Sequence, residues 1–215
     1  MPPRLYDVTP PITPNLAIWP GDTPPSREIL CDIARGDNIT LSTLRATVHL
    51  GAHADGANHY GHPAPSIDAM PLGRYLGPCR VITANAPRGT RVGESHLSAP
   101  LDSIDADATP RVLIRTNTYP DPTNFNRDFA ALEPALVESL AHRGVFLIGI
   151  DTPSVDLCDS KDLPAHKMFL KHDVSILEGI VLTEVPDGVY ELIALPLKLV
   201  GFDASPVRAV LRALE

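Results

Sequence analysis

The chain has 215 residues, of which 44% are hydrophobic, and it carries a formal net charge of −8. This length suits one domain, and the apolar content is sufficient for a packed core, which argues against intrinsic disorder. The acidic balance and the scattered basic residues argue against nucleic acid or an anionic membrane as a partner. No apolar run approaches the roughly 20 residues that a membrane-spanning helix needs.

Proline is unusually frequent near the N-terminus. Because proline removes a backbone donor and disfavours helix interiors, residues 1–27 are expected to form an extended arm, followed by a single domain over 28–215. The first ten residues lack the apolar segment of a secretion signal. The cysteines are odd in number and far apart, which argues against a disulfide framework: Cys31, Cys79 and Cys158. We therefore expect a cytoplasmic protein with reduced thiols.

Several segments have the composition of β-strands. Residues 38–48 are rich in Thr, Leu, Ile and Val, and the alternation slips between Thr43 and Leu44, which predicts a bulge there. Further strands are expected over residues 79–86, 111–117, 145–155, 176–182 and 189–200. The run 145–155 contains Asp151, which would lie near the end of a buried strand.

The strongest helix pattern covers residues 128–143, where leucines recur at every fourth position and Gly144 is placed to end the helix. Pro134 belongs in the first turns, so the helix proper should begin between residues 131 and 133. A second, short helix is expected over 163–173. Strands alternating with two or three helices predict an α/β domain whose helices pack against a mixed sheet or barrel.

Residues 49–59 read HLGAHADGANH and hold four candidate ligands or proton carriers: His49, His53, Asp55 and His59. Imidazole nitrogens with one carboxylate suit Zn²⁺ or Mn²⁺, and the absence of cysteine favours an open catalytic site over a closed structural one. The small Gly and Ala residues between them let the backbone fold closely around an ion. The competing interpretation is a run of exposed polar loop residues.

One carboxylate downstream also stands out. Glu178 lies within the apolar run 176–182, where an ionised side chain is costly unless it is paired or coordinates a metal. An ion pair with arginine, or an edge strand facing water, would explain it equally well. His166 and His172 precede it by twelve and six residues and are rival partners, and spacing alone does not choose between them.

Four segments, which follow one another along the chain, match motifs of a known protein family: HLGAHADGANHY, LIGIDTPSVD, AHKMFLKH and ILEGIVL. Over nearly the whole chain the sequence resembles the bacterial kynurenine formamidases (arylformamidases) of the cyclase-like metal hydrolase family. The resemblance implies a single domain with the swivelling β/β/α fold, in which a few helices pack on a mixed sheet or barrel core. It also implies a homodimer.

The same resemblance implies a site with two Zn²⁺ ions per subunit, with Mn²⁺ as the alternative metal. His49, His53 and Asp55 match the ligands of the first ion, and Asp55 also reaches the second. His166 matches the histidine ligand of the second ion, and Glu178 matches a carboxylate that bridges the two. The resemblance thus favours His166 over His172.

By the same resemblance, His59 matches the catalytic histidine, and Trp19 matches an aromatic residue that contacts the substrate ring near a site shared between subunits. From Trp19 alone, a core position would be the ordinary expectation. The sequence departs from the family at Ala57, where proline is common, and at Asn58, where an apolar residue is common. These departures keep every residue that matches a metal ligand or the catalytic histidine.

The implied reaction is the hydrolysis of N-formyl-L-kynurenine, a small-molecule substrate, to L-kynurenine and formate in tryptophan breakdown. One alternative is a related zinc or manganese hydrolase of another aryl or cyclic amide such as isatin. Another is a metal-binding protein without turnover, against which His59 and Trp19 argue. The sequence has no Gly-x-Ser-x-Gly elbow for a serine hydrolase and no glycine-rich phosphate loop for a nucleotide.

Overall fold

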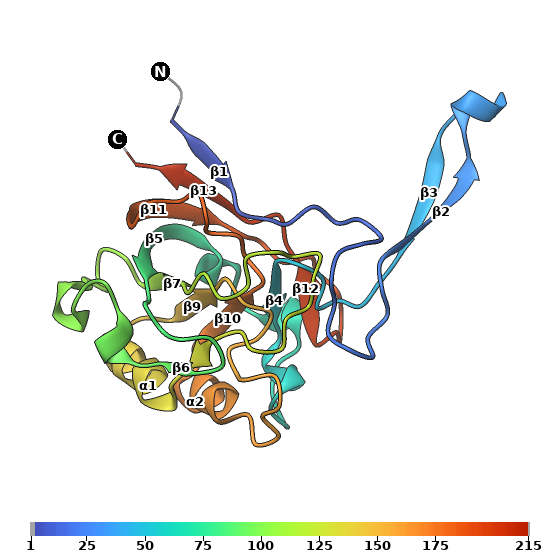
Figure 1. Cartoon of the computed structure of the whole chain (residues 1–215). Coiled ribbons are helices and arrows are strands. Elements are labelled where there is room, and N and C mark those ends of the chain that lie inside the picture. Colours follow the sequence, from blue (N-terminus) through green and yellow to red (C-terminus); the bar gives the residue numbers. More distant parts are fainter. Residues whose placement is uncertain (1–2, 215) are drawn as a thin grey trace.

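A curled, nine-stranded mixed sheet forms the centre of the computed structural model, which describes residues 3–214 (Figure 1). Its strands are β1 (Leu5–Asp7), β4 (His53–Asp55), β5 (Leu76–Thr83), β7 (Arg111–Arg115), β9 (Leu147–Ile150), β10 (Ser175–Glu178), β11 (Gly188–Ile193), β12 (Ala204–Pro206) and β13 (Val210–Ala213). They lie in the order β1-β13-β11-β5-β7-β9-β10-β4-β12. The central strands β5, β7, β9 and β10 are parallel, and the outer strands pair antiparallel.

Two helices, α1 (Pro134–His142) and α2 (Pro164–His172), pack side by side on one face of this sheet (Figure 1). A hairpin of β2 (Ser26–Cys31) and β3 (Leu41–Arg45) projects away from the body. Strands β6 (Arg91–Val92) and β8 (Ala131–Leu132) form a small parallel pair. Short 3₁₀ turns cover Ile33–Arg35, Ala57–His59, Ile67–Ala69, Leu72–Arg74, Glu94–His96 and Leu101–Ser103.

Apolar side chains cover both faces of the sheet. On β7, Val112 and Ile114 face the helices and join the core that contains Leu140 of α1 and Phe169 of α2. Leu113, between them, points to the opposite core. Side chains alternate along a strand, and burial on both faces explains why these strands are continuous apolar runs in the sequence.

The predicted elements are present, with shifted ends. Helix α1 begins at Pro134, just after the predicted start between residues 131 and 133, because residues 131–132 pair as β8 instead. Strand β10 stops at Glu178, where Gly179 turns into the left-handed region with φ +66. Strand β11 ends at Ile193, well before the predicted residue 200, and Pro196 soon removes a backbone donor. Strand β5 lies three residues earlier than predicted.

The predicted bulge between Thr43 and Leu44 is wrong. Those two residues pair in regular register with Glu28 and Arg27, and the irregularity lies on the partner strand between Ile29 and Cys31. An alternation slip in a hairpin exposed on both faces carries no packing constraint, so it does not report a bulge.

The residues from 3 to 27 contain no helix, as their prolines predict. They are not wholly separate from the body, because β1 pairs with β13 at the sheet edge. The boundary of the arm at residue 27 stays a prediction. Between residues 3 and 214, no helix combines the length and the apolar character needed to cross a bilayer.

We expect Leu140→Ala to lower the free energy of unfolding by about 2–5 kcal/mol, because the side chain is fully buried between α1 and the sheet and its removal leaves a cavity. Leu170→Ala on α2 is the matched control, since Leu170 is 39% exposed and its truncation should cost about 1 kcal/mol or less. Urea denaturation measures both. Equal losses in the two variants would contradict this assignment of the core.

Candidate metal centre

Strand β4 and its neighbour β10 build the centre of the site. His53 and Asp55 are alternate residues of β4, so their side chains leave the same face of the strand. Glu178 ends β10 and lies directly opposite His53 in the antiparallel pair, with His53 Nε2 3.2 Å from Glu178 Oε2. All three are buried. Strand pairing therefore sets this part of the cluster.

His49 and His59 flank β4 in the chain and approach the same carboxylate. His49 Nδ1 lies 3.2 Å from Asp55 Oδ1, and the ring centroids of His49 and His59 are 4.2 Å apart. His59 is the last residue of the turn Ala57–His59, and its side chain is 36% exposed. It is the most accessible of the clustered histidines.

Helix α2 supplies the remaining member. His166 lies in its first turn, with Nε2 3.9 Å from both Asp55 Oδ2 and Glu178 Oε1. His172, at the other end of α2, lies against Glu138 instead. The tertiary structure thus brings His166 to the cluster and leaves His172 outside it, an alternative that spacing had left open.

Three of the histidines are oriented by acceptors on the side away from the cluster. His53 Nδ1 donates to the Gly51 carbonyl (2.8 Å), His166 Nδ1 to Asp156 Oδ2 (2.9 Å) and His49 Nε2 to Asp203 Oδ2 (3.0 Å). A carbonyl or carboxylate oxygen only accepts, so these nitrogens carry the hydrogen. The opposite nitrogens therefore face Asp55 and Glu178, and once they carry no proton they would present lone pairs to a metal ion, the arrangement of metal-ligating histidines.

The carboxylate of Asp55 is fully buried, yet neither oxygen has a hydrogen-bond partner within the part of the chain that the structure describes. The same holds for His53 Nε2. A buried carboxylate facing lone pairs costs several kcal/mol unless a cation lies between them. The donor set therefore fits divalent metal ions.

Two groups of ligand atoms lie within 4.8 Å of one another: His49, Asp55 and His59 in one, and His53, Asp55 and Glu178 in the other. Asp55 belongs to both groups, so its two oxygens can serve two neighbouring positions. His166 adds a nitrogen close to Asp55 and Glu178.

The charges of the site shift its proton affinities. Burial disfavours the charged form of His49, but Asp55 and Asp203 outweigh burial and raise the pKa of His49 to about 9. Burial also opposes ionisation of Asp55, but His49 and His53 hold the pKa of its carboxyl below the ordinary value. Burial lowers the pKa of His59, so its imidazole is neutral at pH 7.

Two carboxylates of the site were not predicted from the sequence. Asp203, just before β12, places Oδ2 3.0 Å from His49 Nε2 and 3.6 Å from His59 Nδ1. Asp156 accepts from His166 and from Arg91. Neither lies in an apolar run or near another ligand in the chain, so only the tertiary contacts identify them.

Asp151, which directly follows β9, lies outside the cluster of candidate ligands. Its carboxylate accepts from the backbone of Thr116 and Asn117 and from the Thr116 hydroxyl, so it stabilises the turn after β7. Burial raises its pKa in spite of these bonds. It is not among the clustered ligands.

The four clustered histidines and Glu178 line a cleft of about 320 Å³ that Trp19 also lines. The half-buried Trp19 ring packs edge-on against Phe125, with centroids 5.5 Å apart, and against Phe129 at 6.2 Å. Trp19 therefore forms a wall of the cleft of its own chain. This places the predicted aromatic residue and the predicted ligands around one space.

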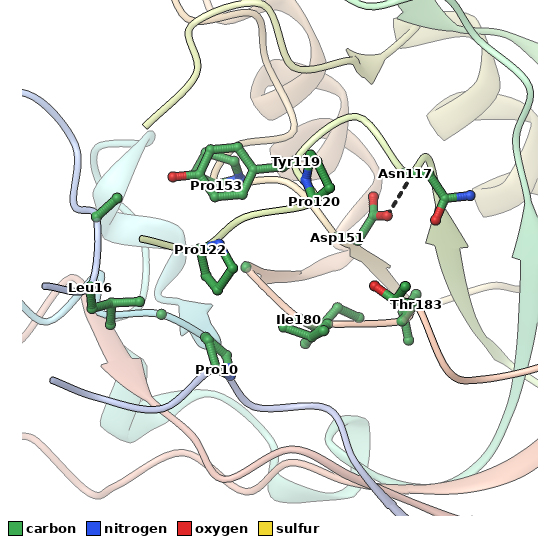
Figure 2. Close-up of a pocket in the computed structure, with 15 residues that line it drawn as sticks. Pro10, Leu16, Asn117, Tyr119, Pro120, Pro122, Asp151, Pro153, Ile180 and Thr183 are labelled. Atoms are coloured by element: carbon green, nitrogen blue, oxygen red, sulfur yellow. Dashed lines mark hydrogen bonds between the residues drawn. The ribbon is translucent and has the colours of Figure 1, made fainter. Parts of the chain in front are cut away.

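A second, smaller pocket, of about 70 Å³, adjoins this cleft and shares Ala17, Gly51 and Pro153 with it. Figure 2 shows prolines and Tyr119 around it, with Asp151 bonded to Asn117 at one side. Its only charged lining residue is thus already hydrogen-bonded to backbone. The pocket adds apolar space beside the cluster and no further ligand.

Comparisons with known proteins agree with this geometry. The family model described as "Putative cyclase" matches residues 6–157. A curated kynurenine formamidase from Bordetella petrii is 44% identical over 211 residues, which cover 98% of this chain and 99% of that protein.

Solved structures share the fold over nearly their full lengths. A potential metal-dependent hydrolase with cyclase activity matches with a TM-score of 0.82 at 28% identity, covering 99% of this chain and 98% of that one. A predicted metal-dependent hydrolase from Bacillus stearothermophilus gives 0.80 at 28%, with 97% and 98% covered. Isatin hydrolase A from Ralstonia solanacearum, at 21% identity and 0.78, with 98% and 92% covered, shares the fold alone. The chain belongs to the putative cyclase family, and the cyclase-like fold that its sequence predicts is confirmed.

Proposed function

We propose that the protein is a kynurenine formamidase that hydrolyses N-formyl-L-kynurenine to L-kynurenine and formate in tryptophan breakdown. The observation that carries the hydrolase chemistry is the buried, unpaired carboxylate of Asp55, faced by histidine lone pairs at a cleft walled by Trp19. The choice of substrate is supported by 44% identity over nearly full length to a protein named for that activity.

The metal assignment is part of the proposal: two Zn²⁺ ions per chain, with Mn²⁺ as the alternative. His49, His53 and Asp55 would hold one ion, and Asp55, His166 and Glu178 the other, as their separations allow. When bound, such ions supply Lewis acidity for the formyl carbonyl and activate water at neutral pH.

His59 is suited to carry the proton of this reaction. Its imidazole is neutral at pH 7 and reaches the open cleft, so it can take a proton from the attacking water and return it to the departing nitrogen. An aryl amine leaves poorly as an anion, which makes this acid step necessary. Asp203, 3.6 Å from His59 Nδ1, stabilises the protonated ring during the transfer.

The cleft fits a substrate of this class. Its volume of about 320 Å³ lies at the lower end of the usual range for small-molecule sites. The exposed part of the Trp19 ring offers a flat apolar surface for an aryl group. Isatin hydrolases share only the fold, which makes a cyclic amide the weaker candidate. The homodimeric state and the cytoplasmic location stay predictions.

The purified protein should release formate from N-formyl-L-kynurenine, and a chelator such as dipicolinate should abolish release. His59→Ala should lower kcat by about 10²–10⁴-fold while its metal content stays at the wild-type level, because the residue carries a proton and does not hold the metal. Formate assay and metal analysis by mass spectrometry measure the two effects. Metal loss in His59→Ala would make His59 a ligand, and faster turnover of isatin than of formylkynurenine would overturn the substrate.

Asp203→Asn should reduce kcat by about 10- to 100-fold, because His49 loses the hydrogen-bonded carboxylate that orients it and His59 loses a nearby negative charge. Asp68→Asn is the matched control: Asp68 accepts from Gly201 and so contacts the same loop without touching a histidine of the site. Steady-state kinetics separates the variants. The proposed role of Asp203 fails if both substitutions lower kcat equally.

Gly179→Ala should weaken metal binding by about 10- to 100-fold, because the added methyl group would overlap the Gly51 carbonyl that orients His53. Gly201→Ala separates this contact from backbone strain: Gly201 also has a left-handed φ of +79, but its added methyl would meet nothing within 4 Å. Competition with a fluorescent zinc chelator measures both affinities. Comparable weakening in the two variants would mean that strain, and not the contact, is responsible.

A further inference from the structure

A second group of ligating side chains lies away from the cleft, at the ends of the two helices. Glu138 and His142 occupy adjacent turns of α1, four residues apart, and His172 is the last residue of α2. One ligand atom from each lies within 4.8 Å of the others. His172 Nε2 is 3.2 Å from Glu138 Oε1, and the rings of His142 and His172 are 5.1 Å apart.

The topology of the fold brings these residues together. Helix α1 leads into β9 and α2 leads into β10, and these two strands are parallel neighbours. The helices therefore run in the same direction and end side by side, each with a histidine as its final residue. The negative ends of two helix dipoles meet in this region, which favours a bound cation.

The donors resemble those of the cleft in composition but include no fully buried residue. Two imidazoles and one carboxylate form a set suited to a first-row divalent ion, with water completing the coordination. His142 is exposed, while Glu138 and His172 are partly buried, so the position is open to solvent. His166 precedes His172 by six residues on the same helix, about 9 Å along its axis. The two groups of ligands are therefore separate.

One neighbour competes for the carboxylate. Lys171 Nζ lies 2.8 Å from Glu138 Oε1. Both side chains are substantially exposed, at 56% and 38%, and exposed ion pairs contribute little to stability. A metal ion with two additional imidazole ligands would outcompete this pair, and removing the lysine would free the carboxylate for the ion.

We propose that Glu138, His142 and His172 form a second metal site, which binds a divalent transition ion such as Zn²⁺ and links the C-terminal ends of α1 and α2. The site is distinct from the cleft and needs no substrate. Because the ion binds the folded arrangement of two helices, its binding stabilises the native state.

Calorimetric titration of the metal-loaded protein with ZnCl₂ tests the site, since the cleft is already filled. The wild type should bind one additional Zn²⁺ per chain, and His142→Ala and His172→Ala should each weaken that binding on the order of tenfold or more, because a ligand is lost. Lys171→Met should bind a few-fold more tightly. His62→Ala, which removes an exposed histidine elsewhere, should bind as the wild type does.

Thermal unfolding gives an independent readout. Added Zn²⁺ should raise the Tm of the metal-loaded wild type and of Lys171→Met. The rise should be absent in His142→Ala, and because the His142 side chain is exposed, this substitution should leave the fold intact. Formylkynurenine turnover should remain unchanged in all these variants. The proposal is overturned if the wild type takes up no additional Zn²⁺, or if both histidine variants take it up with wild-type affinity.

Discussion

The buried carboxylate of Asp55 is the constraint on which the site depends. Neither oxygen has a hydrogen-bond partner in the described chain, and the ring nitrogens of the surrounding histidines face it. Such an arrangement is unfavourable by itself, because desolvating a charge costs more than packing returns. It is stable only with positive charge between the groups. The raised pKa of His49 has the same cause: the carboxylates favour positive charge beside them, which a proton on His49 or a metal ion can supply.

The sheet holds this unfavourable group in place through backbone geometry. Strand β4 lies between β10 and β12, so ladder hydrogen bonds on both sides fix the direction of His53 and Asp55. The close approach of Gly179 to Gly51 lets β10 end beside the segment that leads into β4. A side chain at Gly179 would overlap the Gly51 backbone and push these two segments apart. Rigidity of this kind is what a preorganised site requires.

Two further carboxylates hold histidines of the site through hydrogen bonds. Asp156 orients His166 and is itself held by Arg91, while Asp203 contacts both His49 and His59. Their role is to set which ring nitrogen carries the hydrogen, and so which one faces the cluster. Helix α2 contributes to both sites: His166 in its first turn lines the cleft, and His172, its last residue, belongs to the proposed second site.

The sequence by itself determined the α/β class, the approximate elements, and the candidate ligands within residues 49–59, because local spacing and apolar runs record strand and helix geometry. It could also mark Glu178, since a carboxylate in an apolar run is costly. Element ends were less predictable, as with β10 and β11, because hydrogen-bond partners and turns set them. Spacing did not choose between His166 and His172; the family resemblance favoured His166, and the tertiary structure places it in the cluster. Only the tertiary structure revealed Asp156 and Asp203. Those contacts join residues far apart in the chain, and no local pattern encodes which distant carboxylate a histidine will meet.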